Sequence, residues 1–279
     1  MLNISKDVFV LIPAYNEAAT IRQLAEQCLE LVPNVIVVDD GSQDQTAAQL
    51  MGLPIILLRN AKNEGKAACL WRGFEYALKQ GAQFVVTLDG DGQHNPADIW
   101  RLLNTAIRFP DHIVVGARLH DKKNFPPRRY YANQFARFWI SWASGYPIAD
   151  TQSGFRVYPA SLLSQLSQRE VCWNGFVFES EVLIVASSLG ARSVAVSIPG
   201  IYPQQARASH FRPVRDIARI VLMVAGQLLR RGLYPMGLWR SLSLPMAVVV
   251  AAETLQAATL NLSQAASDNH AALPRIAGD

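Results

Sequence analysis

The sequence predicts an α/β fold with a mostly parallel central sheet flanked by helices and with a C-terminal helical extension. Two patterns support this prediction. Up to residue 116, short continuous apolar runs alternate with segments whose apolar residues recur at helical spacing. Such runs are typical of strands buried on both faces, and their alternation with helices is typical of parallel sheets with right-handed crossovers. In addition, polar clusters follow several of the runs, at the sheet edge where ligands of such folds bind.

The individual elements follow in chain order. The expected strands are 8–12, 35–38, 55–58, 84–88, 113–116 and 193–198. The expected helices are 17–31, 66–79, 96–108 and 175–189, together with a short helix that starts at residue 46 and an aromatic helix around residues 135–142. A further helix is expected over 242–260, and we interpret it as interfacial or packed rather than membrane-spanning. Residues 149–159 form a polar, Gly-containing segment, and 209–231 a basic amphipathic segment. We therefore expect an α/β domain over 1–205, a basic helical extension over 206–260 and a flexible tail over 261–279.

Composition excludes several classes of protein. The chain has 279 residues, of which 50% are hydrophobic and 17% charged, so wholesale disorder is excluded. A net charge of +4 is too small to indicate a nucleic-acid partner. The three cysteines lack zinc-site spacing and suit a reducing compartment. No signal peptide and no apolar stretch of the ~20 residues of a membrane span is evident. We expect a cytoplasmic protein.

An acidic pair follows the strand expected at 84–88. Asp89-Gly90-Asp91-Gly92-Gln93-His94 places two carboxylates two residues apart, and Gln93 adds a third oxygen. Hard divalent cations prefer oxygen ligands, and Mg²⁺ commonly takes one or two carboxylates together with substrate phosphates. The alternative is an ordinary Gly-Asp turn between a strand and a helix.

Two further polar loops follow the first two strands. In Asp39-Asp40-Gly41-Ser42, a carboxylate at a strand end can accept hydrogen bonds from a base or a ribose, so Asp39 or Asp40 is expected to face a ligand. Asp44 is expected to cap the next helix. In Pro13-Ala14-Tyr15-Asn16-Glu17, Tyr15 offers a stacking face and Glu17 a carboxylate. Each loop is also compatible with a plain helix start.

Four loops together carry a family resemblance. They are Pro13-Ala14-Tyr15-Asn16-Glu17, Val38-Asp39-Asp40-Gly41-Ser42, Asn63-Glu64-Gly65-Lys66 and Asp89-Gly90-Asp91-Gly92-Gln93-His94. In this order and spacing, over about residues 8–215, they resemble the family 2 inverting glycosyltransferases, which have the Rossmann-like GT-A fold. Gly116-Ala117-Arg118 and the segment 150–156 narrow the resemblance to the dolichyl- and polyprenyl-phosphate sugar synthases.

The resemblance implies roles for matching positions. A divalent cation, Mg²⁺ or Mn²⁺, would be held by Asp89, Asp91 and Gln93 beside the diphosphate of the donor. A UDP- or GDP-sugar donor would lie against Pro13, Tyr15, Glu17, Val38 and Asp40. Other matching positions are Arg118 near the reacting phosphates, Arg128 or Arg129 in the acceptor loop, Glu179 or Glu181 near the sugar, and Arg207 and Arg212 as anion contacts. Lys66 either reaches the diphosphate or is a solvated lysine. One position departs from the family, because His210 stands where a lysine is usual.

The acceptor decides whether the implied hexosyl transfer needs a base. The phosphate of a polyprenyl phosphate is already anionic near pH 7, since its second pKa is ~6, so direct displacement with inversion needs none. Guanidinium groups such as that of Arg118 suit phosphate geometry. A hydroxyl acceptor, as in a glycolipid or glycan, needs a base, and Asp150 is then the candidate.

Two other functions remain possible from the sequence, and the role of one basic, aromatic surface is undecided. A nucleotidyltransferase also uses a Rossmann-like sheet with acidic ligands, but its Gly- and Lys-rich N-terminal signature is missing. A non-catalytic sugar-nucleotide-binding protein is the other rival. The basic segment 213–231 and the aromatic helix either pack on the domain or dock on a membrane, peripherally and on the inner face of the cytoplasmic membrane.

Overall fold

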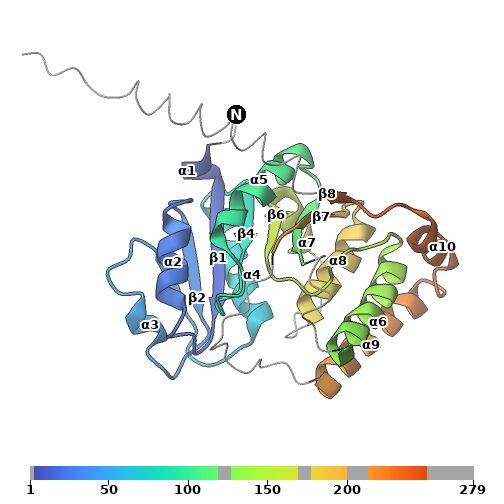
Figure 1. Cartoon of the computed structure of the whole chain (residues 1–279), viewed down its shortest axis with the longest axis horizontal. Helices are drawn as coiled ribbons and strands as arrows, with labels where there is room; N and C mark the ends of the chain where they lie inside the picture. Colours follow the sequence, from blue (N-terminus) through green and yellow to red (C-terminus); the bar gives the residue numbers. More distant parts are fainter. Residues whose placement is uncertain (1–2, 119–126, 169–176, 200–212, 250–279) are drawn as a thin grey trace, which may run out of the picture.

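An eight-stranded sheet runs through the molecule in the order β3-β2-β1-β4-β6-β5-β7-β8 (Figure 1). The computed structural model describes residues 3–118, 127–168, 177–199 and 213–249. Within them, the strands are β1 Val8–Ala14, β2 Val35–Asp39, β3 Ile56–Arg59, β4 Phe84–Thr87, β5 Ile113–Ala117, β6 Arg156–Pro159, β7 Ser193–Ser197 and β8 Val248–Val249. The helices are α1 Ile4–Asp7, α2 Ile21–Leu29, α3 Thr46–Gln49, α4 Lys66–Lys79, η1 Pro96–Asp98, α5 Ile99–Arg108, α6 Pro127–Ser144, α7 Ala160–Leu166, α8 Phe178–Ser188, α9 Pro213–Arg230 and α10 Pro235–Ser243.

Strand direction confirms a mostly parallel sheet. β3, β2, β1 and β4 run parallel to one another, as do β5, β7 and β8. Only β6 is antiparallel to its two neighbours, β4 and β5, among the described strands. The carboxyl ends of β1, β2 and β4 therefore lie at one edge of the sheet, where the polar loops begin.

Helices cover both faces of the sheet, and alternation along the strands supplies both cores. In β1, Phe9 and Leu11 pack with α4, α6, α7 and α8, while Val10 and Ile12 pack with α2 and α5. α9 joins the first of these cores through Ile220, Val224 and Leu228. A strand buried on both faces lacks the polar alternation of a half-exposed strand, which is why continuous apolar runs predicted β1, β2, β4, β5 and β7 correctly. The edge strand β3 is also an apolar run, although its residues alternate between half-buried and exposed.

Five described elements were not expected from the sequence: helices α1, α7 and α10 and strands β6 and β8. The segment 149–159, expected as a polar stretch, ends in strand β6. The prediction of a helix over 242–260 is wrong for residues 244–249. α10 ends at Ser243, and the chain then extends into β8, which pairs with β7. Pro245 gives the reason, because a proline disfavours helical backbone at the residue before it. Residues 250–279 and 200–212 lie outside the described part, so the proposed domain boundaries and tail stay predictions.

Candidate active site

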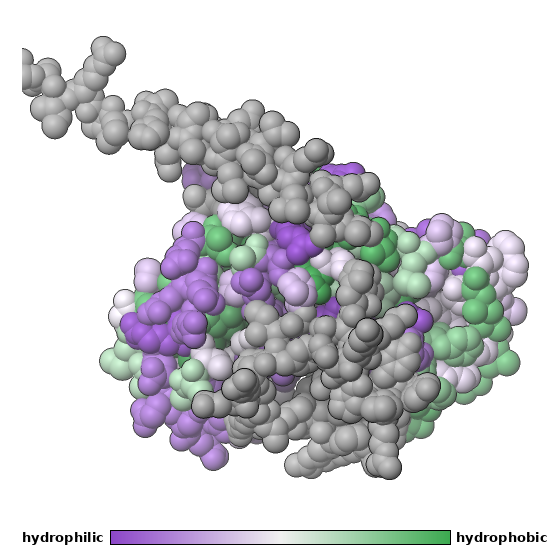
Figure 2. All heavy atoms as spheres, in the orientation of Figure 1, coloured by the Kyte–Doolittle hydropathy of each residue, from purple (hydrophilic) through white to green (hydrophobic). Residues whose placement is uncertain are grey.

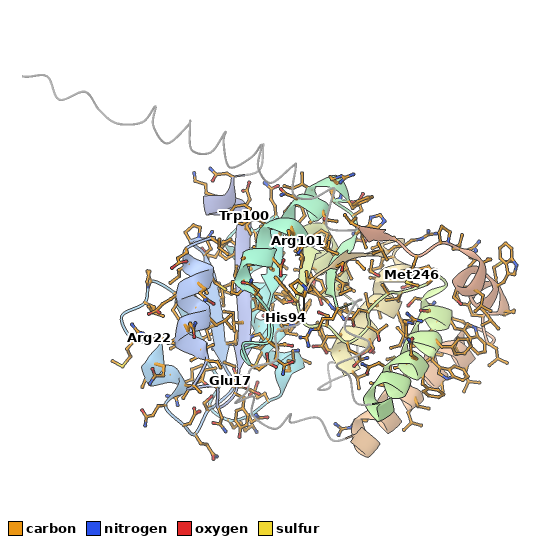
Figure 3. All side chains as sticks on the ribbon, in the orientation of Figure 1. Glu17, Arg22, His94, Trp100, Arg101 and Met246 are labelled. Atoms are coloured by element: carbon orange, nitrogen blue, oxygen red, sulfur yellow. The ribbon has the colours of Figure 1, made fainter. Side chains whose placement is uncertain are left out.

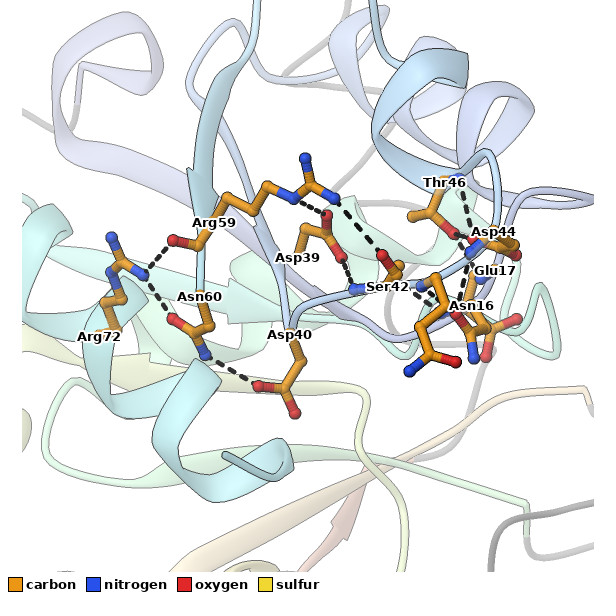
Figure 4. Close-up of polar contacts among 11 residues, drawn as sticks. Asn16, Glu17, Asp39, Asp40, Ser42, Asp44, Thr46, Arg59, Asn60 and Arg72 are labelled. Atoms are coloured by element: carbon orange, nitrogen blue, oxygen red, sulfur yellow. Dashed lines mark hydrogen bonds and ion pairs between the residues drawn. The ribbon is translucent and has the colours of Figure 1, made fainter. Parts of the chain in front are cut away.

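The loops after β1, β2 and β4 are joined by direct hydrogen bonds. Asn16, in the left-handed region at φ 56°, accepts a hydrogen bond on Oδ1 from the backbone N–H of Gln43 at 2.8 Å, and its own N–H donates to Ser42 Oγ at 2.9 Å. Figure 4 labels Asn16 and Ser42, which lie side by side. Thr20 Oγ1 donates to the carbonyl of Gly90 at 2.6 Å, which ties the third loop to the first. The predicted convergence of the three loops is confirmed.

Four of the predicted donor residues lie along this edge. Pro13 and Val38 are buried and face each other in register at the ends of β1 and β2. Tyr15 and Glu17 are half-buried in the loop after β1. A Cβ built on Gly90 would lie 3.4 Å from Glu17 Cγ, so Glu17 reaches the loop that carries the acidic pair.

Asp40 organises the loop that leads into α4. Its Oδ1 accepts hydrogen bonds from Asn60 Nδ2 and the N–H of Glu64, and its Oδ2 accepts one from the N–H of Gly65, each at 2.8 Å. The Asn60 contact is drawn in Figure 4. The carboxylate is 3% exposed, so its internal contacts position Lys66, the first residue of α4. A further contact of Asp40 with a nucleotide stays a prediction.

Asp39 has a comparable internal role. Its Oδ1 accepts a hydrogen bond from the N–H of Ser42 at 2.9 Å, and Arg59 Nε lies 3.1 Å from its Oδ2. The guanidinium of Arg59 is more than half exposed, whereas the Asp39 side chain is fully buried. Asp39 therefore fixes the turn after β2 and places an exposed cation beside it. Asp44 was expected as the N-cap of α3, but that position is Gln45; Asp44 precedes it and accepts a hydrogen bond from the N–H of Thr46, the first residue of α3, at 2.9 Å.

An open pocket of about 650 Å³ lies beside these loops, lined by Tyr15, Gly41, Ser42, Gln43, Arg59, Asn60, Ala61, Lys62 and Asn63. Its volume falls within the range typical of small-molecule sites. Gly41 adopts φ +68°, and a Cβ there would lie 2.8 Å from the backbone of Lys62. Only glycine fits this close approach, which keeps the two walls of the pocket together.

Asp89 lies at the centre of an ion-pair network. Lys66 Nζ is 2.5 Å from Asp89 Oδ1 and 2.6 Å from Glu179 Oε1. Burial opposes ionisation of Asp89, but the charges of Lys66, His94 and Arg118 outweigh it and hold the pKa of Asp89 below its usual value. Burial likewise opposes the charge of Lys66, yet the two carboxylates raise its pKa. Asp89 and Lys66 are therefore both charged near neutral pH.

Asp91 differs from Asp89 in its electrostatics. Its Oδ1 accepts a hydrogen bond from the N–H of Gln93 at 3.0 Å. Burial and the nearby charge of Asp89 raise the pKa of Asp91. A carboxylate whose charge is opposed by a neighbouring carboxylate would be stabilised by a divalent cation bound to both. No group of three or more His, Cys, Asp or Glu side chains suited to a metal forms within the described residues. A cation here would thus take much of its coordination from a ligand or water, as Mg²⁺ commonly does.

Arg118 lies next to the acidic pair. Its Nη1 donates to Gln93 Oε1 at 3.3 Å, and its Nη2 lies 3.0 Å from His94 Nε2. His94 is 3% exposed, packs on Phe155 and is labelled near the middle of the molecule in Figure 3. Burial and the charge of Arg118 lower the pKa of His94 to about 4. A neutral imidazole can accept the hydrogen bond from Arg118, so His94 helps to orient the guanidinium.

Asp150 caps a turn. Its Oδ1 accepts hydrogen bonds from the N–H groups of Gln152 at 2.8 Å and Ser153 at 3.1 Å. This is the structural alternative to a general base, and a base role stays a prediction. The turn leads to Gly154, where a Cβ would lie 2.5 Å from both carboxylate oxygens of Asp89.

Arg156 is a site residue whose role the sequence analysis missed. The side chain is fully buried. Its Nε donates to the carbonyl of Ser153 at 2.7 Å, its Nη1 to that of Glu179 at 2.8 Å and its Nη2 to that of Thr151 at 3.1 Å. The signal available was a lone cation within the apolar run Phe155-Arg156-Val157-Tyr158. Arg156 links the 151–154 turn to the first turn of α8.

Several predicted residues cannot be placed in this site. Arg128 and Arg129 belong to the first turn of α6, but their side chains are not among those described. Arg207, His210 and Arg212 lie outside the described residues. Glu181 is buried in α8, two residues after Glu179. Their predicted roles stay predictions.

Comparison with known proteins identifies the family. The model for "Glycosyl transferase family 2" matches residues 9–166, more than half of the chain. The chain belongs to glycosyl transferase family 2. The predicted family 2 glycosyltransferase is thus confirmed, and the loops after β1, β2 and β4 all fall within the matched region.

Two relatives in this family are named as lipid-phosphate sugar transferases. The UDP-N-acetylglucosamine–dolichyl-phosphate N-acetylglucosaminyltransferase of Methanococcus voltae is 30% identical over 230 residues, covering 73% of this chain and 89% of its own. The polyprenol monophosphomannose synthase of Mycolicibacterium smegmatis is 28% identical over 200 residues, covering 68% and 75%. These relatives agree with the predicted branch of the family.

Solved structures confirm the GT-A fold. Mannosyl-3-phosphoglycerate synthase from Rubrobacter xylanophilus superposes with a TM-score of 0.59 at 17% identity, covering 81% of this chain and 74% of its own. Glucosyl-3-phosphoglycerate synthase from Mycobacterium tuberculosis, solved with Mn²⁺, UDP and glucosyl-3-phosphoglycerate, gives 0.53 at 20% identity, covering 81% and 80%. At such low identity the likeness concerns the fold.

Proposed function

We propose that this family 2 glycosyltransferase moves a hexose from a UDP- or GDP-sugar to a polyprenyl phosphate with inversion at the anomeric carbon. One observation carries the proposal: Asp89 and Asp91 follow β4 beside two cationic side chains, Lys66 and Arg118. An acidic pair can hold a cation, and the neighbouring cationic side chains attract phosphates. Together these groups can stabilise a diphosphate leaving group. The pocket around Tyr15 offers room for the nucleoside.

The cation is part of this proposal. Asp89 and Asp91 would hold Mg²⁺ or Mn²⁺, with Gln93 as a third oxygen ligand, and the ion would neutralise charge that develops on the leaving diphosphate. The Mycobacterium tuberculosis neighbour, which shares the fold, was solved with Mn²⁺ and UDP, and this supports the use of a divalent cation. The protein itself positions the charged groups before any ligand binds: Lys66 holds Asp89 in place, and His94 holds Arg118.

The acceptor assignment is supported by the relatives and by Asp150. The two relatives are named for dolichyl phosphate and for a polyprenol monophosphate product. A phosphate oxygen attacks as an anion, so no residue needs to remove a proton from it. The Oδ1 atom of Asp150 already accepts two backbone hydrogen bonds, which suits a cap better than a base.

Replacing Asp150 by Asn tests the acceptor class. The amide oxygen of Asn can still accept both backbone hydrogen bonds, whereas the amide cannot act as a base. We expect Asp150→Asn to retain kcat within about threefold with polyprenyl phosphate, because no general base is required. Nucleotide release would be measured for UDP- and GDP-sugars with polyprenyl phosphate, with polyprenol and without acceptor.

The controls separate this proposal from its rivals. Asp150→Ala removes both backbone contacts, so a lower Tm in that variant alone would confirm the capping role. A loss of about a hundredfold in Asp150→Asn at unchanged Tm would favour the hydroxyl acceptor. Release of pyrophosphate from a nucleoside triphosphate and a sugar phosphate would indicate a nucleotidyltransferase. Sugar-nucleotide binding without any turnover would indicate a binding protein.

A lipid acceptor requires the enzyme to reach a membrane surface. None of the helices in the described ranges has the length and apolar character to traverse a bilayer. Several large apolar side chains of α9, α10 and the turn between them are nevertheless exposed: Val221, Leu222, Leu229, Leu233, Met236, Trp239 and Leu242. Figure 2 shows apolar atoms at the surface on the side of the molecule where Figure 1 places α10. Arg230 and Arg240 add exposed positive charge.

These features support docking on an anionic bilayer that carries the polyprenyl phosphate, peripherally on the inner face of the cytoplasmic membrane. Basic helices with exposed apolar side chains lie in the interface plane of such bilayers. One side of α9 packs on the core through Ile220 and Val224, as the alternative interpretation expected. The exposed side, with Leu222 and Leu229 two turns apart, remains available for lipid.

Leu222→Glu is expected to weaken docking. Leu222 is 72% exposed, so a carboxylate there should not disturb the fold but should oppose insertion among anionic headgroups. We expect about a tenfold loss of co-sedimentation with anionic liposomes at low salt. Met51→Glu is the matched control, because Met51 is 75% exposed and lies after α3. Equal binding of both variants and the unmodified chain would contradict docking through α9.

A further inference from the structure

Lys66 bridges two carboxylates from different parts of the fold. Its ammonium group lies 2.5 Å from Asp89 Oδ1, after β4, and 2.6 Å from Glu179 Oε1, in the first turn of α8. The exposed fraction is 23% for the Lys66 side chain, 28% for Asp89 and only 7% for Glu179. The ammonium group is therefore held on the buried side by Glu179 and on the more open side by Asp89.

The contact with Asp89 has a consequence for the proposed cation. A divalent ion between Asp89 and Asp91 needs an oxygen of Asp89, and Gly154 packs against that carboxylate so closely that a Cβ would clash with both oxygens. Asp89 thus has little freedom to serve two cations by moving. An ammonium group at 2.5 Å from one oxygen would also repel a divalent ion on the same carboxylate.

Glu179 offers Lys66 a second position. The backbone of Glu179 is held in place by Arg156, whose Nη1 donates a hydrogen bond to the Glu179 carbonyl at 2.8 Å. If the contact with Asp89 is lost, Lys66 can keep its hydrogen bond to Glu179. The positive charge then remains in the site without an unpaired buried carboxylate beside it.

We propose that Lys66 is a built-in counter-ion of Asp89 that competes with the divalent cation, and that Glu179 retains the ammonium group when the cation binds. The inference rests on the proposed function, and it deepens that function by assigning a positioning role to Lys66 and Glu179. In the absence of a donor, Lys66 neutralises Asp89. With a cation held by Asp89 and Asp91, Lys66 would contact Glu179 alone, and its charge would be available to the diphosphate.

Binding of Mn²⁺ without donor tests the competition. Electron paramagnetic resonance would be used to measure free Mn²⁺ in titrations of the full chain. Lys66→Met should bind Mn²⁺ about tenfold more tightly, because it removes the competing charge. Glu179→Gln should bind it about threefold more weakly, since Lys66 then depends on Asp89 alone. Lys66→Arg keeps a cation in place and should not gain affinity.

Lys79→Met is the matched control, because Lys79 is the exposed last residue of the same helix, α4. Its affinity for Mn²⁺ should equal that of the unmodified chain. Circular dichroism would establish that each variant is folded, and Glu179→Gln and Lys66→Arg carry the test if Lys66→Met does not fold. A crystal structure with Mn²⁺ should show Lys66 Nζ on Glu179 and away from Asp89.

The outcomes distinguish this inference from the proposed function. If the unmodified chain binds Mn²⁺ and Lys66→Met binds it equally or more weakly, the competition is overturned and the proposed function stands. A gain in Lys66→Arg as large as that in Lys66→Met would also overturn it. If the unmodified chain binds no Mn²⁺, with or without UDP, the cation in the proposed function fails and the inference fails with it.

Discussion

Asp91→Asn is expected to lower kcat for sugar transfer by about a thousandfold, which is the scale of losing one preorganised electrostatic contact to a transition state. Asp91 is the cleaner of the two acidic positions to change. Its Oδ1 accepts the N–H of Gln93, and an amide oxygen can do the same, so the loop should keep its conformation. Asp89, by contrast, also pairs with Lys66. The measurement is steady-state nucleotide release at saturating donor, with Mg²⁺ and with Mn²⁺.

A matched change far from the site provides the control for Asp91→Asn. Asp111 is exposed and precedes β5, at the opposite end of the strands, so Asp111→Asn should have unchanged kcat. The Tm of Asp91→Asn should stay close to that of the unmodified chain. Full activity of folded Asp91→Asn would remove the acidic pair from the proposed mechanism.

Gly154→Ala is expected to lower kcat by at least about a hundredfold, since small displacements of a catalytic group have effects of this size. The added methyl group would lie 2.5 Å from both oxygens of Asp89 and would displace the carboxylate from Lys66. The backbone of Gly154 is not among the positive-φ glycines, so alanine itself is conformationally acceptable there. The measurement is kcat together with the Kd for Mn²⁺, which should weaken in parallel.

Gly226→Ala serves as the control for this substitution. Gly226 lies in α9, and a Cβ there would meet nothing within 4 Å. Alanine stabilises a helix by up to about 1 kcal/mol relative to glycine, so activity should be unchanged and Tm slightly higher. Wild-type activity of Gly154→Ala would show that Asp89 can move without loss of function, and the proposed role of a fixed Asp89 would be wrong.

The sequence was sufficient to predict the strands β1 to β5 and β7, because each of them lies in a continuous apolar run. It was not sufficient for β6, where Arg156 and Pro159 interrupt the apolar pattern. The cost of burying Arg156 is offset by carbonyl groups from residues 151, 153 and 179, and these contacts depend on the tertiary fold. β8 was missed for a similar reason. It consists of only two residues, Val248 and Val249, and it forms a strand because β7 lies beside it.

Prediction of the site had a comparable limit. The position of polar loops after β1, β2 and β4 was enough to predict that they meet, because parallel strands end at the same edge. Which side chains pair within the site was not predictable from spacing. Lys66 and Glu179 are far apart in sequence and belong to different helices, and Asp40 and Asp150 use their oxygens on local backbone N–H groups.

The buried guanidinium of Arg156 makes the clearance around Asp89 and the placement of Glu179 interdependent. One side chain holds both the 151–154 turn and the start of α8, so neither can shift without straining the other. Both carboxylates that contact Lys66, those of Asp89 and Glu179, are therefore positioned through one buried side chain. In the proposed mechanism, the charged groups around the diphosphate would thus be aligned by the protein's interior rather than by loops that adjust separately.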